Sequence, residues 1–270
     1  MIEYNKSSKR VSIMNNNPIG FLDSGIGGLS VLKKAYKLLP NEDFVFFSDS
    51  AHNPYGDKSD EEIKQRCDKI VKYLIAKKNC KAIVLACNTA SAKAAEYLRA
   101  KYSNIPIIAI EPAYKMVHDY NPDGATIVMA TKGTLESEKF HRLYKKYDNK
   151  HTKLLACVGM ADIIEQDRKE DLALYLEDLL GEYKGKVQNI VLGCTHYPLA
   201  KQEIRNVLGD VKFFDGAEGV SRRLKAVLAQ DNLLTESEAE GKITFLDSSE
   251  TKEQRELKAK RFFNLFKKYE

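Results

Sequence analysis

Residues 83–89 read IVLACNT, and residues 190–196 read IVLGCTH. Each stretch is a short apolar run followed by a small residue, a cysteine and polar side chains. Apolar runs of this length are typical of buried strands in a parallel sheet. Because the pattern occurs twice, we predict two related α/β halves, with Cys87 and Cys194 each at the carboxyl end of a strand.

Strands and helices are expected to alternate around these two stretches, which predicts mostly parallel sheets. Further apolar runs predict strands at residues 19–22, 44–47, 106–110 and 126–130. Apolar residues at helical spacing, or an alanine-rich composition, predict helices at residues 63–77, 90–101, 136–147, 171–183 and 251–268. We therefore expect two pseudo-symmetric α/β domains with the active site in the cleft between them, since ligands of open α/β sheets bind beyond the carboxyl ends of strands.

The composition limits the classes of protein to which the chain can belong. It has 270 residues, 43% hydrophobic and 30% charged, which is an ordinary balance for a globular protein. No apolar run approaches the roughly 20 residues of a membrane helix, and residues 1–17 lack an apolar signal core. We therefore predict a cytoplasmic protein without membrane contact, with residues 1–17 as a flexible extension. The net charge of +5 comes without a clustered basic motif, so no nucleic-acid partner is expected.

The five cysteines do not indicate a disulfide or metal framework. Their number is odd, their spacing is irregular, and no CxxC pair suggests zinc. We therefore expect no metal site. Cys67, Cys80 and Cys157 have no matched counterpart in the other half, so we interpret them as packing residues.

Two cysteines at equivalent positions of two halves can face each other across a cleft, as racemisation at an α-carbon requires. One base removes a proton from one face, and an acid returns a proton to the other. A thiol suits both roles because its unperturbed pKa of about 8.5 can be tuned towards neutrality. The helix expected after Cys87 would stabilise a thiolate there, and His196 could exchange a proton with Cys194.

Polar residues near the strand ends complete the predicted site. Asp23 and Asp49 each end a predicted strand, so both should reach the same cleft. They could hold a substrate ammonium or act as bases towards Cys87. Donors for an α-carboxylate are expected from Asn88, Thr89, Thr195 and His196.

Each of these features also has a simpler interpretation. A single cysteine at the end of an apolar strand is usually a small buried hydrophobe, and only the matched pair favours chemistry. Asp23 and Asp49 could cap helices, and His196 could be a hydrogen-bonded core residue. The glycines at residues 25–28 could serve only a tight turn. They do not complete a dinucleotide-binding GxGxxG motif, because Ser30 occupies the last glycine position.

From about residue 19 to the C-terminus, the chain resembles the glutamate racemases of the aspartate/glutamate racemase superfamily. The resemblance rests on four segments: FLDSGIGGLS at residues 21–30, DS at 49–50 with PYG at 54–56, ACNTAS at 86–91, and GCTHYPL at 193–199. It implies reversible conversion of L-glutamate to D-glutamate without a cofactor, for bacterial peptidoglycan, by a homodimer. It also implies that the C-terminal segment completes the first domain. The expected domains are residues 18–111 plus 216–270, and residues 112–215.

The resemblance further implies roles for individual residues. Cys87 would act on D-glutamate with Asp23 assisting, and Cys194 would act on L-glutamate with His196 assisting. Glu165 matches a family glutamate near the second thiol. The substrate's carboxylates and ammonium would be held by Ser24, Tyr55, Gly56, Asn88, Thr89, Thr131, Thr134 and Thr195.

Three other functions are compatible with parts of this pattern. A racemase for another acidic amino acid, such as aspartate, would share the two thiols, although the four segments favour glutamate. A non-catalytic protein that binds small anions on the same fold would need neither thiol, because fold alone does not define function. A nucleic-acid-binding module would rest only on the basic C-terminal segment.

Overall fold

The computed structural model describes residues 15–147 and 150–269. Residues 1–14, which make up most of the predicted flexible extension, lie outside the described residues. The end of that predicted extension packs against the fold, because Asn15 is buried and its backbone carbonyl accepts a hydrogen bond from the Lys81 ammonium. Lys81 is itself buried and forms an ion pair with Glu42.

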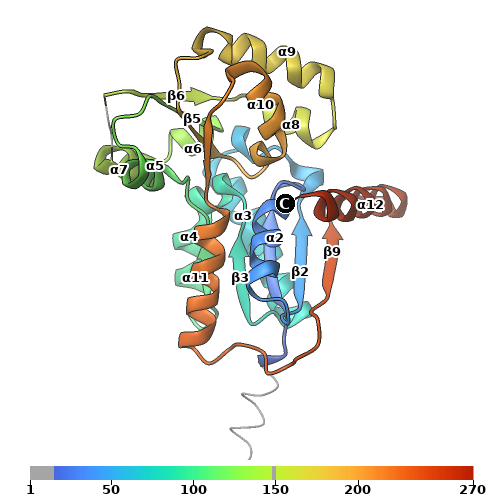
Figure 1. Ribbon diagram of the computed structural model, residues 1–270. Helices are drawn as coiled ribbons and strands as arrows, with labels where there is room; N and C mark the ends of the chain where they lie inside the picture. Colours follow the sequence, from blue (N-terminus) through green and yellow to red (C-terminus); the bar gives the residue numbers. More distant parts are fainter. Residues whose placement is uncertain (1–14, 148–149, 270) are drawn as a thin grey trace, which may run out of the picture.

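Nine strands form two sheets in the described part of the chain (Figure 1). The first sheet has the order β4-β3-β1-β2-β9 and the second the order β6-β5-β7-β8, and all neighbouring strands pair in parallel. The strands of the first sheet are β1 (Ile19–Asp23), β2 (Phe44–Ser48), β3 (Ala82–Leu85), β4 (Ile107–Ala109) and β9 (Ile243–Asp247). Those of the second sheet are β5 (Thr126–Ala130), β6 (Thr152–Ala156), β7 (Asn189–Gly193) and β8 (Lys212–Asp215).

The strand orders show that the two halves are related. When the strands of each half are counted in chain order, both sheets run second, first, third, fourth, and β9 is added beside β2 in the first sheet. Cys87 follows the third strand of its half closely, and Cys194 comes directly after the third strand of the other. The predicted pseudo-symmetric α/β architecture is therefore confirmed.

Side chains along a strand alternate between the two faces of its sheet. Both faces of each sheet carry apolar side chains, and helices cover both. Phe46 of the first sheet packs with α2, α11 and α12, whereas Leu22 packs with α3 and α4. Met129 of the second sheet packs with α8, α9 and α10, whereas Val128 packs with α5 and α7. The helices are α2 (Leu29–Leu38), α3 (Asp60–Lys78), α4 (Asn88–Lys101), α5 (Tyr114–Tyr120), α6 (Lys132–Leu135), α7 (Glu138–Tyr147), α8 (Met160–Glu165), α9 (Lys169–Leu180), α10 (Lys201–Leu208), α11 (Ala217–Gln230) and α12 (Lys252–Lys268).

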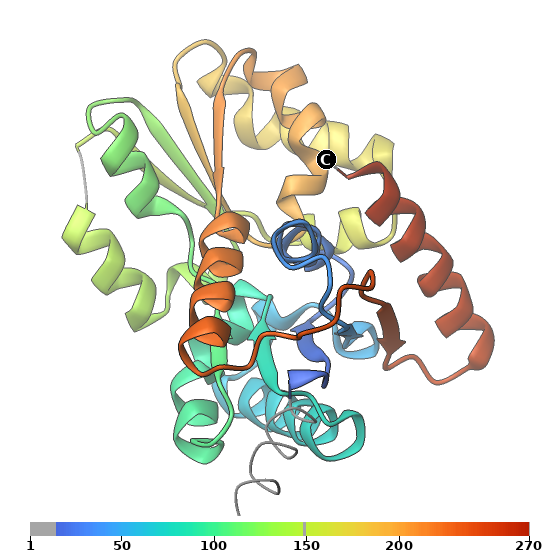
Figure 2. The same ribbon diagram turned by 60° about the horizontal axis from the view of Figure 1, so that its bottom comes forward.

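The C-terminal segment runs back along the first sheet, where β9 pairs with β2 and α12 follows (Figure 2). A capping box between Thr251 and Gln254 begins α12. The helix is held by Phe262, whose buried ring lies 4.8 Å from the Phe46 ring and 4.6 Å from the Phe245 ring, measured between centroids. This aromatic cluster fixes the position of α12 relative to the first sheet.

We expect Phe262→Ala to lower the free energy of unfolding by about 3–5 kcal/mol, because it leaves a cavity among buried rings. Leu257→Ala on the same helix is the matched control. Leu257 is 69% exposed, so its truncation should change stability by less than about 0.5 kcal/mol. Urea denaturation of both variants measures the difference, and equal midpoints would show that the aromatic cluster does not anchor α12.

Candidate active site

The two matched cysteines lie at the carboxyl ends of their sheets, where ligands of open α/β sheets bind. Cys87 is the N-cap of α4, and Cys194 follows β7 directly. Both are nearly buried, with exposed fractions of 5% and 7%. Ser24, in the loop after β1, lies beside Cys87, and His196, in the loop after β7, lies beside Cys194.

Cys87 has two hydrogen-bond partners, but burial favours its neutral thiol. Its Sγ donates to Ser24 Oγ and accepts from the backbone N–H of Ala90, both at 3.5 Å. Burial nevertheless raises the pKa of the Cys87 thiol to about 12, and the nearby Asp23 carboxyl group adds to this effect. The expected stabilisation of a thiolate by the helix N-terminus is therefore present as a hydrogen bond but is outweighed by desolvation.

Asp23 joins the two halves of the site. Its Oδ1 accepts a hydrogen bond from Thr195 Oγ1 at 3.0 Å, and its Oδ2 accepts one from the backbone N–H of Gly25 at 3.0 Å. The side chain is fully buried, and this burial raises its pKa although His196, Gly25 and Thr195 oppose the shift. Asp23 therefore lies next to Cys87 as a carboxyl group that can take up a proton more readily than an exposed aspartate.

Cys194 has a different set of partners. Its Sγ lies 3.8 Å from His196 Nδ1, and His196 Nε2 lies 2.7 Å from Glu165 Oε2. Burial alone would lower the pKa of His196, but its contacts with Cys194 and Glu165 raise it well above its usual value. Burial likewise opposes ionisation of Glu165, yet the hydrogen bond from His196 holds its pKa below the ordinary range. Cys194, His196 and Glu165 thus form a hydrogen-bonded series, and the raised pKa of His196 favours its protonated form.

The glycine-rich loop after β1 packs directly against Glu165 and His196. The backbone N–H of Ile26 donates to Glu165 Oε2 at 3.0 Å. A Cβ atom on Gly27 would lie 2.7 Å from the backbone nitrogen of His196, and one on Gly25 would overlap the Glu165 carboxylate. Close approach of the backbone therefore requires glycine at residue 27, and a side chain at residue 25 would displace the Glu165 carboxylate. Both roles go beyond the tight turn that the simpler interpretation allowed.

A second polar cluster joins the loops after β3 and β5. Thr89 Oγ1 lies 2.9 Å from Thr131 Oγ1 and 3.4 Å from Thr134 Oγ1, and Thr131 Oγ1 lies 2.9 Å from Thr134 Oγ1. A Cβ atom on Gly56, in the short 3₁₀ helix Tyr55–Asp57, would meet Thr131 at 3.2 Å. The structure thus brings together predicted substrate-binding residues that are far apart in the sequence.

Asn88 has an amide oxygen available for a ligand. The residue is 4% exposed, and its Oδ1 is buried without a hydrogen-bond partner in the described part of the protein. An unpaired buried acceptor costs free energy, so a bound ammonium group would be stabilised there. Asn88 also lines a cavity of about 10 Å³ that extends to Cys194 and Thr195, which leaves room for about one water molecule.

Asp49 has protein partners on both of its carboxylate oxygens. Arg66 donates to them at 2.6 and 3.0 Å, Tyr55 donates its hydroxyl at 2.6 Å, and His52 lies 3.0 Å away. Burial opposes ionisation of Asp49, but these donors lower its pKa. In this arrangement Asp49 fixes Tyr55 rather than offering a free carboxylate to the cleft. Arg66 is absent from the predicted site, because its role depends on contact between α3 and the loop after β2, which no local pattern reveals.

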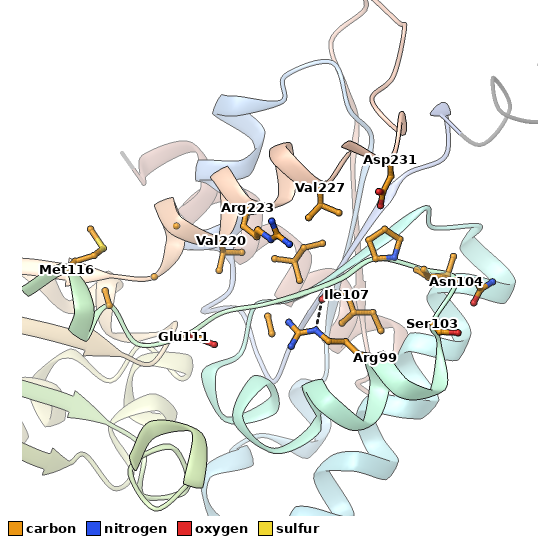
Figure 3. A pocket seen from close by; sticks show the side chains of 17 residues that line it. Arg99, Ser103, Asn104, Ile107, Glu111, Met116, Val220, Arg223, Val227 and Asp231 are labelled. Carbon is orange, nitrogen blue, oxygen red and sulfur yellow. Dashed lines mark hydrogen bonds between the residues drawn. The ribbon is translucent and has the colours of Figure 1, made fainter. Parts of the chain in front are cut away.

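Figure 3 shows a wide groove whose lining includes neither thiol. It has a volume of about 830 Å³ and runs along the edge strand β4, between α4 and α11. Arg99 Nε donates to the backbone carbonyl of Ile107 at 3.0 Å and so covers part of that edge. None of the predicted catalytic residues is among the described residues that line the groove.

Neither a metal-binding cluster nor a membrane-spanning helix occurs among residues 15–147 and 150–269. No cluster of three or more His, Cys, Asp or Glu side chains there is arranged to hold a metal ion. None of the described helices is both long enough and apolar enough to cross a membrane.

We expect Gly27→Ala to lower the free energy of unfolding by about 1–3 kcal/mol, because its Cβ would collide with backbone that cannot easily move. Gly219→Ala is the control, since a Cβ there meets nothing within 4 Å in α11. That change should be neutral or stabilise the protein by up to about 1 kcal/mol through helix propensity. Chemical denaturation compares the two, and a harmless Gly27→Ala would contradict the close approach to His196.

Comparison with known proteins agrees with this geometry. The Asp/Glu/Hydantoin racemase family model matches residues 27–222. A glutamate racemase from Clostridium perfringens is 44% identical over 252 residues, covering 92% of this chain and 96% of the relative. The chain is therefore related to these enzymes along most of its length.

Solved structures show the same relationship. A glutamate racemase from Francisella tularensis, in complex with D-glutamate, matches with a TM-score of 0.76 and 31% identity, covering 93% of this chain and 94% of that one. The Escherichia coli glutamate racemase, in complex with L-glutamate and the activator UDP-MurNAc-Ala, matches with a TM-score of 0.79 and 28% identity, covering 91% and 95%. The chain therefore belongs to the Asp/Glu/hydantoin racemase family and, within it, to the glutamate racemases.

Proposed function

We propose that the chain interconverts L-glutamate and D-glutamate without a cofactor or metal, using Cys87 and Cys194 as its acid/base pair. One observation carries this proposal. Two buried thiols follow corresponding strands of two related sheets, and each has its own ionisable partner, Asp23 for Cys87 and His196 with Glu165 for Cys194. This is the arrangement that proton transfer on opposite faces of one carbon requires.

The different surroundings of the thiols suggest how a turnover begins. Burial keeps Cys87 as a thiol, whereas His196 can hold the proton that Cys194 gives up, which leaves a Cys194 thiolate beside an imidazolium. Cys194 as thiolate would remove the Cα proton of L-glutamate, and the Cys87 thiol would deliver its proton to the opposite face to give D-glutamate. The reaction leaves a Cys194 thiol and a Cys87 thiolate, which is the state that accepts D-glutamate in the reverse direction.

The substrate would lie among the polar groups around the thiols. We propose that the unpaired Asn88 Oδ1 accepts from the substrate ammonium and that the N-terminus of α4 attracts a carboxylate. Hydroxyl and backbone donors for the two carboxylates would come from Ser24, Tyr55, Gly56, Thr89, Thr131, Thr134 and Thr195. Asp49 would contribute indirectly, by holding Tyr55.

We also propose that the two halves act as domains, residues 18–111 plus 216–270 and residues 112–215. The cavity beside Cys194 and Asn88 is too small for glutamate, so the domains would separate to admit substrate and close around it, which excludes water. The biological setting that we propose is a cytoplasmic homodimer that supplies D-glutamate for peptidoglycan. The muramyl nucleotide bound to one structural neighbour, as its activator, supports the link to peptidoglycan.

Incubation of the purified protein with L-glutamate, followed by chiral separation, tests the proposed function directly. We expect D-glutamate to appear without added pyridoxal phosphate and after dialysis against a chelator. A requirement for a restored metal would contradict the two-thiol mechanism, and a protein that binds glutamate without converting it would show the non-catalytic alternative.

We predict that Cys87→Ala and Cys194→Ala each lower kcat/KM for racemisation by at least about a hundredfold, because general acid–base groups contribute about 10²–10⁴-fold. In deuterated water, the inverted product should carry deuterium at Cα from the first turnover, while recovered substrate carries little. Cys80→Ala is the control, since Cys80 is a buried packing residue, and its kcat should stay within a small factor. Near-normal racemisation by Cys87→Ala, or equal labelling of both enantiomers, would exclude two separate thiols.

Specificity gives a further prediction. Glutamate should be converted with a kcat/KM about 10- to 200-fold higher than that for aspartate, which is the range that one methylene group controls in a shaped pocket. The measurement is the initial rate with each L-amino acid under the same conditions. Comparable values would favour a broader racemase over the glutamate-specific enzyme.

A further inference from the structure

The C-terminal helix contacts the active site through its basic residues. The Arg261 guanidinium on α12 donates to two backbone carbonyls at the end of α8, those of Glu165 and of Ile164, the latter at 2.7 Å. Lys258, one turn earlier on α12, places its Nζ 3.9 Å from Glu165 Oε1. The backbone and the carboxylate of Glu165 therefore both lie against α12.

Arg261 acts from a firmly held position. The next residue, Phe262, is buried in the aromatic cluster of the first sheet, and Phe266 is nearly buried one turn further on. Arg261 extends from this anchored helix to α8, which packs with the second sheet. The contact thus fixes the end of α8 relative to the first sheet.

The end of α8 is where such a contact has the greatest effect. α8 has only six residues, and the last carbonyls of a helix lack partners within the helix and favour nearby cations. Glu165 is its last residue, and Oε2 of Glu165 accepts from both Ile26 N and His196 Nε2. A small rotation of the end of α8 would therefore lengthen the Glu165–His196 hydrogen bond.

We propose that Arg261, supported by Lys258, is a positioning residue for Cys194: it holds Glu165, which orients His196 against the Cys194 sulfur. This inference rests on the proposed function, in which Cys194 is one of the two acid/base thiols. Supporting residues that lock the rotamers of an active group are a general requirement for precise chemistry. Cys87 is not part of this series of contacts, because its partners are Ser24, Ala90 and Asp23.

A positioning role and a purely structural role predict different results. If Arg261 only tied α12 to α8, its loss would lower stability but leave the chemistry of the folded enzyme unchanged. If it positions Glu165, its loss weakens the contact that raises the pKa of His196. His196 would then lose its proton at a lower pH. The reactivity of the Cys194 thiol would change as a result, whereas that of the Cys87 thiol would not.

The test compares Arg261→Gln, Arg261→Lys and Lys258→Gln with the control Lys260→Gln in the full-length chain. Lys260 is exposed on the same helix, so the control removes the same charge without the contact to α8. For each variant we would measure the melting temperature and the pH dependence of kcat/KM for L-glutamate. We would also measure the rate at which iodoacetamide alkylates Cys194 and Cys87 at each pH, by peptide mass spectrometry.

We expect Arg261→Gln to lower kcat/KM by about tenfold, which corresponds to the loss of one charge-assisted hydrogen bond. The limb of the pH profile that reports loss of the His196 proton should move to lower pH. Alkylation of Cys194 at a given pH should become slower, because the neighbouring positive charge that favours its reactive thiolate is weakened, while alkylation of Cys87 stays unchanged. Arg261→Lys should restore part of the activity, Lys258→Gln should have a smaller effect because its contact is longer, and Lys260→Gln should match the unmodified chain.

Two outcomes would overturn the inference. The first is an Arg261→Gln enzyme with unchanged kcat/KM and an unchanged Cys194 alkylation profile at a temperature where it is folded. The second is a parallel change at both thiols that follows only the melting temperature. Alkylation does not require turnover, so failure of the proposed function remains distinguishable: a chain that does not racemise glutamate could still show the selective change at Cys194.

Discussion

The site depends on the close approach of two loops, the one after β1 and the one after β7. Thr195 donates to Asp23 across this contact, and Ile26 donates to Glu165, whose carboxylate also contacts His196. Glycines after β1 make the approach possible, since a side chain at Gly27 would collide with backbone. Because the two loops exclude water from one another, burial and a few remaining partners shift the pKa values of Asp23, Glu165 and His196.

The pKa values of the two active-site carboxyl groups move in opposite directions because their partners differ, although burial opposes ionisation of both. Asp23 is surrounded by neutral donors and more distant charge, so desolvation dominates and its pKa rises. Glu165 receives a hydrogen bond from a protonated imidazole, so its pKa falls despite similar burial. The result is one carboxyl group biased towards its neutral form beside Cys87, and one ionised carboxylate behind His196. Divergent environments of this kind are how paired residues take different acid/base roles.

The sequence predicts the fold well because the central strands are apolar along their whole length, and the matched strand–cysteine segments identify both halves. It does not predict β6, β8 or β9, which lie at sheet edges or carry polar and exposed residues that weaken the apolar pattern. The sequence also does not predict the roles of Arg66 and Arg261, because their partners come close only in the tertiary fold. The expectation of a stabilised Cys87 thiolate is wrong for a related reason. Local sequence shows the helix N-terminus but not the depth of burial, which raises the pKa of Cys87.

The symmetry of the fold and the asymmetry of the site have different structural origins. The repeated strand order places one thiol after the third strand of each sheet, which suits a substrate whose two enantiomers present opposite faces. The added segment, β9 and α12, has no counterpart in the second half, and it reaches from the first sheet to the end of α8. It therefore contacts the surroundings of Cys194 without an equivalent at Cys87. A two-sided reaction needs the thiols to hold opposite protonation states at the same moment, and a support that acts on one of them alone is a direct way for the fold to separate those states.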